Sequence, residues 1–246
     1  MRIGASTYYS LITGQDIRSV VDELQKARFS TIELMFQNPV SKEAIADLKS
    51  RKLDYSMHGP FEGLSRMQMI EESLDAAIEL ECTHYVLHPD KMNKTSEQKE
   101  IRFQQFIKSL GALLGKYLGK GPQILVENMP HDSRVGGTIT DLARIKQEVQ
   151  GIGIVYDFGH GALTKQKLGH ELQIYYFHLS DNLLEIDSHM SLGLGIIEWK
   201  SVIGRLTKPD VKNIIENTSS AECLRSREYL ESIQQVPKDP FLGMKL

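Results

Sequence analysis

The stretch IGIVYDFGH, residues 152–160, contains a short apolar run that ends in Asp157 and is followed by His160. An apolar run without alternation is typical of a parallel strand covered on both faces. A carboxylate and an imidazole three residues apart at a strand end can form a metal clamp, an acid/base pair, or a helix cap beside an unrelated histidine. The stretch therefore predicts both a strand and a candidate functional site.

Seven other short runs are predominantly apolar and β-branched, so we expect eight strands in all. The seven are RIGAST (2–7), TIELMF (31–36), LDYSMH (53–58), HYVLH (84–88), QILVEN (123–128), IYYFHL (174–179) and NIIEN (213–217).

Segments with helical periodicity lie between these runs. In residues 13–28, for example, Val20, Val21 and Leu24 fall on one helical face. The other expected helices are 41–52, 64–81, 96–118, 138–149, 196–206 and 220–233. Ser41 and Thr138 are expected helix starts. Only 160–171 has a pattern that is poor for a helix.

Eight alternations of strand and helix in a chain of this length predict a single-domain (β/α)₈ barrel over residues 1–246. Residues 236–246, which include two prolines, are expected to form an irregular tail. A doubly wound open sheet is the alternative architecture.

The composition excludes several classes of protein. Of 246 residues 41% are hydrophobic and 25% charged, which suits one large globular domain, and the net charge of −3 gives no bulk attraction to nucleic acid or an anionic membrane. Cys82 and Cys223 are far apart, so neither a disulfide framework nor a cysteine-built zinc site is expected. Without a signal-peptide pattern or a run of about 18 apolar residues, we expect a soluble cytoplasmic protein with no membrane partner. No GxGxxG follows a strand, so no dinucleotide site is expected.

Histidines and carboxylates recur at the ends of the predicted strands and in the loops that follow. In a barrel of this type, these ends converge on one mouth, where the active site lies. Several carboxylates there would repel one another unless cations neutralised them, and a mixture of imidazole and carboxylate suits zinc, manganese or iron. The candidate ligands are His58, His88, Glu127, Asp157, His160, His178, Asp187, His189 and Glu216.

The spacing of Asp187 and His189 supports a metal site. In an extended loop, residues i and i+2 point the same way, so both side chains can reach one ion. Asn128, Ser180 and Asp181 border the expected cavity and are expected to orient ligands. Glu33, within strand two, is either another such orienting group or a buried ion-pair partner, and the sequence leaves both open.

These motifs resemble those of the xylose isomerase-like TIM barrels. MHGPF, LHPD, VENMP, DFGH, FHLSD, DSHMSLGLG and IENT follow one another over nearly the whole chain. Within that superfamily the fullest match is to the endonuclease IV branch, zinc enzymes that cleave DNA at abasic sites, because all nine metal-ligand types are present.

The resemblance implies up to three divalent ions, most readily Zn²⁺, with Mn²⁺ or Fe²⁺ as alternatives. The first ion would be held by His58, His88 and Glu127. The second would share Glu127 and add Asp157, His178 and Glu216, and the third would use His160, Asp187 and His189. Sugar isomerases and epimerases of the superfamily are similar around the second ion only.

Two departures from the endonuclease pattern concern the substrate. Phe61 lies near the position of a tyrosine that helps to open the DNA stack in that branch, and the loop after strand two is only QNPVS. Phe61 can be read as a wedge between bases or as apolar cover for the barrel mouth. These differences affect the expected substrate and not the expected metal site.

The main expectation is therefore a metal-dependent hydrolase that cleaves an abasic-DNA or other sugar-phosphate phosphodiester with metal-activated water. Glu127, Glu216 and Asp157 are the expected catalytic carboxylates. The first alternative is a sugar or sugar-phosphate isomerase or epimerase with one ion, and the second is a non-catalytic metal-binding barrel. A metal content near three ions per chain would favour hydrolysis, and one near one ion would favour isomerisation.

Overall fold

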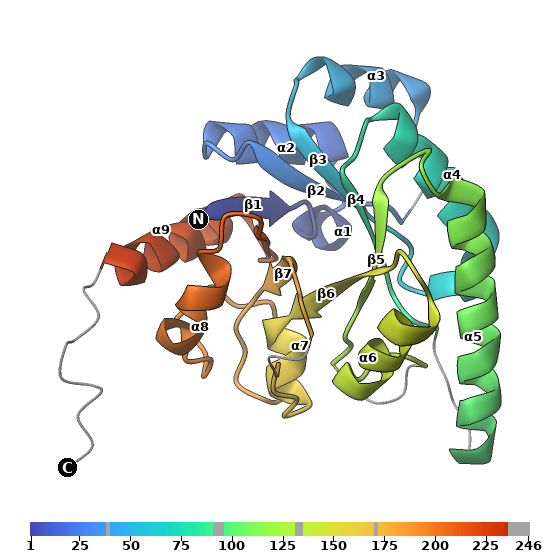
Figure 1. Cartoon of the computed structure of the whole chain (residues 1–246). Coiled ribbons are helices and arrows are strands. Elements are labelled where there is room, and N and C mark those ends of the chain that lie inside the picture. Colours follow the sequence, from blue (N-terminus) through green and yellow to red (C-terminus); the bar gives the residue numbers. More distant parts are fainter. Residues whose placement is uncertain (38–39, 91–95, 131–134, 170–171, 236–246) are drawn as a thin grey trace, which may run out of the picture.

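The computed structural model describes residues 1–37, 40–90, 96–130, 135–169 and 172–235. Its eight strands are all parallel and form a closed barrel in the order β1 to β8, with helices around the outside (Figure 1). Closure is made by β1 and β8, where Ala5 pairs with Ile215. The predicted (β/α)₈ barrel is confirmed, and the open sheet is excluded because an open sheet has no such pairing.

The strands lie within two residues of the positions that the apolar runs predicted. They are β1 (Arg2–Ser6), β2 (Thr31–Met35), β3 (Asp54–His58), β4 (His84–Leu87), β5 (Gln123–Glu127), β6 (Gly153–Asp157), β7 (Tyr176–Leu179) and β8 (Lys212–Ile215). β7 begins later than predicted, at Tyr176, and β8 begins at Lys212, one residue earlier.

The helices follow the predicted segments with two exceptions. They are α1 (Tyr9–Thr13), α2 (Ile17–Lys26), α3 (Lys42–Ser50), the 3₁₀ turn η1 (Gly63–Arg66), α4 (Met67–Glu79), α5 (Ser96–Tyr117), α6 (Ile139–Glu148), α7 (Phe158–Leu163), α8 (Trp199–Leu206) and α9 (Ser220–Gln235). Both predicted helix starts are confirmed: Ser41 Oγ accepts the N–H of Ala44, and Thr138 Oγ1 accepts that of Asp141.

The first exception is the segment predicted as one helix over 13–28. Its helix, α2, begins only at Ile17, after Asp16, whose carboxylate accepts the N–H of Arg18. The short α1, which was not predicted, precedes it and ends at Gly14, whose φ of 71° lies in the left-handed region. The second is the six-residue α7 in the segment judged poor for a helix. It is too short to show a helical period, and its start is fixed by a cap rather than by an apolar face.

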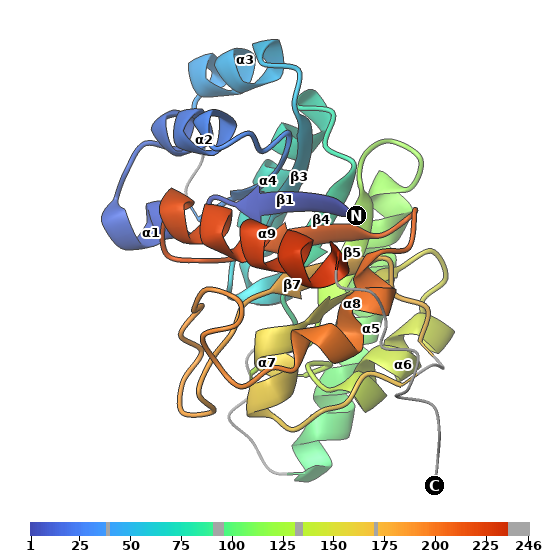
Figure 2. The same ribbon diagram turned by 90° about the vertical axis from the view of Figure 1, so that its left-hand side faces the viewer.

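The core has an outer and an inner part. Between the sheet and the helices, fully buried residues such as Val20, Val21 and Leu24 of α2 pack on the barrel. Both cysteines are buried and free, as predicted. The helical ring is completed by α9, which contacts α8 and α2 (Figure 2).

The inner core fills the barrel as layers of side chains, because every second residue of a strand points inward. One layer is apolar apart from the hydroxyl of Tyr176, and consists of Val86, Leu125, Val155, Tyr176 and Ile214. Below it, at the amino-terminal end, the buried Lys212 contacts Asp54 at 3.0 Å and Thr83 at 2.8 Å. Above it, at the carboxyl-terminal end, lie the candidate ligands.

No helix within the described residues is both long enough and apolar enough to cross a bilayer. The irregular tail predicted for 236–246 falls outside the described part of the chain.

Candidate metal centre

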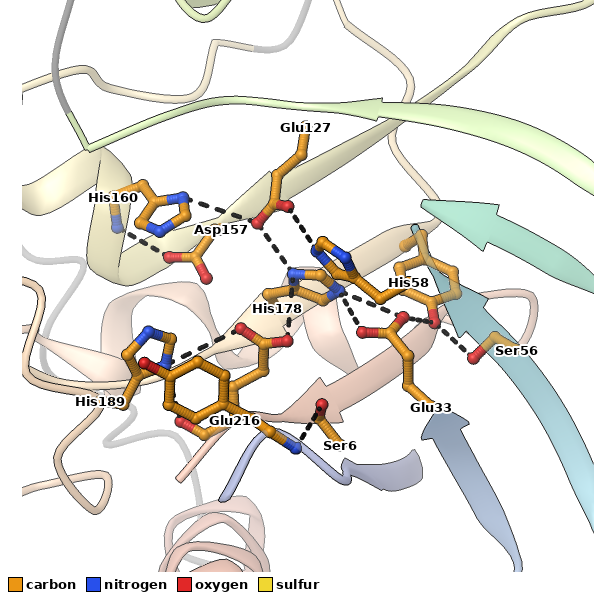
Figure 3. Close-up of polar contacts among 12 residues, drawn as sticks. Ser6, Glu33, Ser56, His58, Glu127, Asp157, His160, His178, His189 and Glu216 are labelled. Atoms are coloured by element: carbon orange, nitrogen blue, oxygen red, sulfur yellow. Dashed lines mark hydrogen bonds and ion pairs between the residues drawn. The ribbon is translucent and has the colours of Figure 1, made fainter. Parts of the chain in front are cut away.

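The strand period places the candidate ligands at the carboxyl-terminal mouth of the barrel. His88, Glu127, Asp157, His178 and Glu216 each follow, two positions later, a residue of the apolar layer. Their side chains therefore point into the barrel above that layer. The nine predicted ligands meet at this one mouth, and Figure 3 shows most of them.

Glu127 lies at the centre of the group and is 1% exposed. Its Oε2 is 3.3 Å from His58 Nε2 and 3.0 Å from His88 Nε2. Its Oε1 is 2.9 Å from His178 Nδ1 and 3.5 Å from His160 Nδ1. Each oxygen of one carboxylate thus faces two imidazoles, which is the arrangement expected of a bridging ligand.

His178 connects Glu127 to two other carboxylates. Its Nδ1 lies 3.7 Å from Glu216 Oε1, while its Nε2 lies 3.1 Å from Glu33 Oε1 on the opposite edge of the ring (Figure 3). Glu33 is fully buried and accepts a hydrogen bond from the Tyr176 hydroxyl. Glu33 is therefore a buried ion-pair partner of His178, a candidate ligand, and this contact agrees with both interpretations of Glu33.

Asp157 caps α7 and still has an oxygen directed into the site. Its Oδ1 accepts the N–H of His160 at 2.7 Å, and no hydrogen-bond donor in the described residues reaches its buried Oδ2. Asn128 holds the Asp157 backbone from both sides, accepting its N–H at 2.7 Å and donating to its carbonyl at 3.0 Å. The expectation that Asn128 orients ligands agrees with these contacts.

The long loop between β7 and α8 brings in the remaining two candidates. Asp187 Oδ2 is 3.0 Å from His160 Nε2 and 3.3 Å from His189 Nε2. Asp181, which is fully buried, anchors this loop: its carboxylate accepts the N–H groups of Asn182, Gly193 and Ile197 and the indole N–H of Trp199.

Four histidines share one feature that fits metal binding. His58, His160 and His189 each place Nδ1 at 2.8 to 3.2 Å from a backbone carbonyl, leaving Nε2 toward a carboxylate, and His178 places Nε2 on Glu33 and Nδ1 toward Glu127. Metal-bound histidines are oriented in this way, with the second nitrogen donating to a carbonyl or carboxylate. Neighbouring ligands of a tetrahedral zinc ion are about 3.3 Å apart, close to the nitrogen–oxygen distances found here.

The carboxylates of the site are neutralised by protons on themselves and on the neighbouring imidazoles. Burial, opposed by His178 and His189, raises the pKa of Glu216 to about 7. Burial also raises the pKa of Asp157. Burial alone would lower the pKa of His178, but Glu216, Glu33 and Glu127 hold it well above its usual value. Protons thus neutralise a carboxylate cluster that a bound cation would neutralise instead.

The mouth encloses a cavity of about 260 Å³. Seven of the predicted ligands line it, namely His58, His88, Glu127, His160, Asp187, His189 and Glu216. Its other walls are Tyr8, Met35, Phe61, Met129 and Pro130. Phe61 stacks on His88 and Tyr8 stacks on His189, so of the two interpretations of Phe61, its position agrees with apolar cover for the mouth.

Sequence reasoning missed two parts of this site. Tyr8 lies just past β1, a strand for which no polar end residue was identified, although the sequence position next to a strand end was a usable signal. The contact between Glu33 and His178 joins residues 145 positions apart, and no local pattern indicates it.

A closed (β/α)₈ barrel with buried histidine and carboxylate groups that could hold a metal defines the class of this protein. The chain belongs to the xylose isomerase-like TIM barrel family, whose model matches residues 21–238.

The chain is similar to one uncharacterized curated protein, MJ1614 of Methanocaldococcus jannaschii, with 27% identity over 88% of this chain and 92% of that protein. Among solved structures it is similar to a D-tagatose 3-epimerase-like protein (TM-score 0.82, 22% identity, 96% of this chain and 97% of that one). It is also similar to the IOLI protein with a bound zinc atom (TM-score 0.77, 14% identity, 95% of this chain and 98% of that one). Several other matching structures are sugar epimerases.

Proposed function

We propose that this protein is a metal-dependent isomerase or epimerase of a small sugar, with one ion held by Glu127, Asp157, His178 and Glu216. The observation that carries the proposal is the position of the three acids around His178, on the ends of four successive strands. A divalent ion bound there would polarise the carbonyl group of a ketose or aldose. The chemistry that remains is the movement of a proton at the neighbouring carbon.

Glu127 and Glu216 are placed to move that proton. Both carboxylates approach His178 Nδ1, at 2.9 and 3.7 Å, from different strands. In an epimerisation, one carboxylate removes the proton beside the carbonyl and the second returns a proton to the opposite face. His58, His88 and His160 line the same cavity and would donate hydrogen bonds to the hydroxyl groups of the sugar.

The cavity supports a small substrate. Its volume of about 260 Å³ suits a single sugar, and its walls combine apolar and aromatic side chains with histidines and carboxylates that can form hydrogen bonds with hydroxyl groups. None of the described residues that line it is lysine or arginine, the side chains most often used to bind phosphate groups. The matching epimerase structures point in the same direction, and for this reason we place the isomerase above the hydrolase that the motif resemblance implied.

Proton exchange with solvent tests the proposal directly. Protein loaded with Mn²⁺, Co²⁺ or Zn²⁺ is incubated in D₂O with a panel of ketoses, aldoses and their phosphates, and deuterium at the carbon beside the carbonyl is followed by proton NMR. We expect exchange with at least one sugar, and its loss in Glu216→Gln. Asp54→Asn, at the opposite end of the barrel, is the matched control and should retain exchange. Absence of exchange across the whole panel would refute the proposal.

A metal-dependent phosphoesterase is the second candidate, favoured by one specific observation. Asp187 Oδ2 lies 3.0 and 3.3 Å from the imidazoles of His160 and His189, and an isomerase with one ion has no need of these contacts. With Glu127 as a bridge to His58 and His88, the nine side chains could hold three ions.

Elemental analysis separates the two candidates. About three equivalents of metal per chain, falling by about one in His189→Ala, together with metal-dependent cleavage of a duplex containing an abasic site, would establish the phosphoesterase. About one equivalent, unchanged in His189→Ala, would exclude it.

A further inference from the structure

The Glu33 carboxylate is buried inside the barrel, beside the apolar layer. In the register of the sheet Glu33 pairs with Ser56, one level below the candidate ligands, and it is 0% exposed. The neighbouring inward layer includes Val86, Leu125 and Ile214. A buried carboxylate is costly unless hydrogen bonds and an opposite charge compensate it.

Two groups compensate Glu33, and they form one chain of contacts. Ser56 Oγ lies 2.7 Å from the hydroxyl of Tyr176, which donates to Glu33 Oε2 at 2.5 Å. The two Glu33 oxygens then lie 3.1 and 3.3 Å from His178 Nε2 (Figure 3). Residues of β2, β3 and β7 take part in this series of contacts. Ser56 and Tyr176, which lie below the mouth, therefore fix the position of Glu33.

We propose that Glu33 is a positioning residue for the metal, which holds His178 with its Nε2–H donated downward and its Nδ1 lone pair directed up at the ion. This inference depends on the metal site of the proposed function, but on none of its substrates. A carboxylate behind a ligating histidine fixes the tautomer and orientation of the ring and makes it a stronger donor. Because Nδ1 is the nitrogen that faces Glu127 and Glu216, the tautomer decides whether His178 can bind.

The alternative is that Glu33 is itself a ligand, since Glu33, His178 and Glu216 also lie within ligand distance of one another. The contact with Tyr176 argues against this alternative, because one Glu33 oxygen already accepts a strong hydrogen bond. The other oxygen, Oε1, lies 3.1 Å from His178 Nε2 but has no hydrogen-bond partner among the described residues, so metal stoichiometry decides between the two roles.

Metal affinity is the decisive measurement, since it requires no substrate. Co²⁺ and Zn²⁺ dissociation constants and stoichiometries are measured by calorimetry, and by Co²⁺ visible absorption, for the wild type, Glu33→Gln and the matched control Asp54→Asn. We expect Glu33→Gln to weaken binding by about 10- to 100-fold at unchanged stoichiometry and to change the Co²⁺ spectrum. Asp54→Asn should bind as the wild type does. Unchanged affinity in Glu33→Gln, or the loss of one whole equivalent, would overturn the proposal.

A measurement on the wild type keeps the inference testable if Glu33→Gln does not fold. With ¹⁵N-histidine and Zn²⁺, we expect His178 to retain its Nε2 proton and to bind zinc through Nδ1, and zinc on Nε2 would overturn the proposal. Tyr176→Phe, which removes the hydroxyl donor to Glu33, should weaken binding by a smaller factor. A wild type that binds no ion would refute both proposals, whereas a wild type that binds metal but converts no sugar would refute the proposed function alone.

Discussion

Asp157 accepts the backbone N–H of His160 with one carboxylate oxygen, while its other oxygen is buried and is reached by no hydrogen-bond donor of the described residues. A helix cap and a metal ligand are therefore compatible roles for this side chain. Asparagine caps helices as well as aspartate does, but it is a weaker metal ligand. We expect Asp157→Asn to keep the stability of the metal-free protein within about 1 kcal/mol while metal affinity falls. Asp157→Ala should lose both metal affinity and stability, and about 1 kcal/mol of the lost stability should come from the missing helix cap. Urea denaturation and calorimetry measure the two effects, and equal metal affinity in Asp157→Asn would contradict the assignment.

Replacing Asp181 should release the β7–α8 loop. Its carboxylate holds three backbone N–H groups and the Trp199 indole, and the loop carries Asp187 and His189. In Asp181→Ala we expect faster hydrogen exchange over residues 182–198 and a loss of about 2 kcal/mol or more in unfolding free energy, because buried donors lose their acceptor. Exchange in β1 to β5 serves as the internal control. Exchange at the wild-type rate in the loop would show that other contacts hold it.

Metal addition should stabilise the folded protein. The site binds in the folded state only, since its ligands come from residues 58 to 216 of the chain. At a free metal concentration one hundred times the dissociation constant, the gain is about 2.7 kcal/mol. Thermal unfolding in EDTA and after re-addition of Zn²⁺ or Mn²⁺ measures it. Glu127→Gln should show much less of this gain, and a full gain in that variant would argue that the metal binds elsewhere.

His84 should make stability depend on pH below neutrality. Burial, with Lys212 nearby, lowers the pKa of His84 from 6.5 to about 4. Between these values the unfolded chain binds a proton that the folded protein does not, so stability falls as the pH falls from about 6.5 to 4. After allowance for partial exposure, His84 accounts for about 2 kcal/mol of this loss. We expect His84→Gln to lose that much less stability than the wild type over the same range. If the unfolding free energies of His84→Gln and the wild type fell equally over this pH range, His84 would not be the source of the loss.

The strands and most helices could be predicted from the sequence because apolar runs and helical periods are local properties. The nine candidate ligands could be located for the same reason: strand ends meet at one mouth once the barrel is inferred. The short α1, the late start of α2 and the short α7 depend on single caps and turns rather than on periodicity. The partner of Glu33 depends on which side chains face each other across a closed barrel, and that is a property of the fold alone.

The apolar layer of Val86, Leu125, Val155, Tyr176 and Ile214 separates the cluster at the mouth from the Lys212–Asp54 pair below. We therefore expect substitutions at the mouth to leave the contact between Lys212 and Asp54 in place. A search for new activities on this scaffold would vary the residues above that layer and keep the residues beneath it constant.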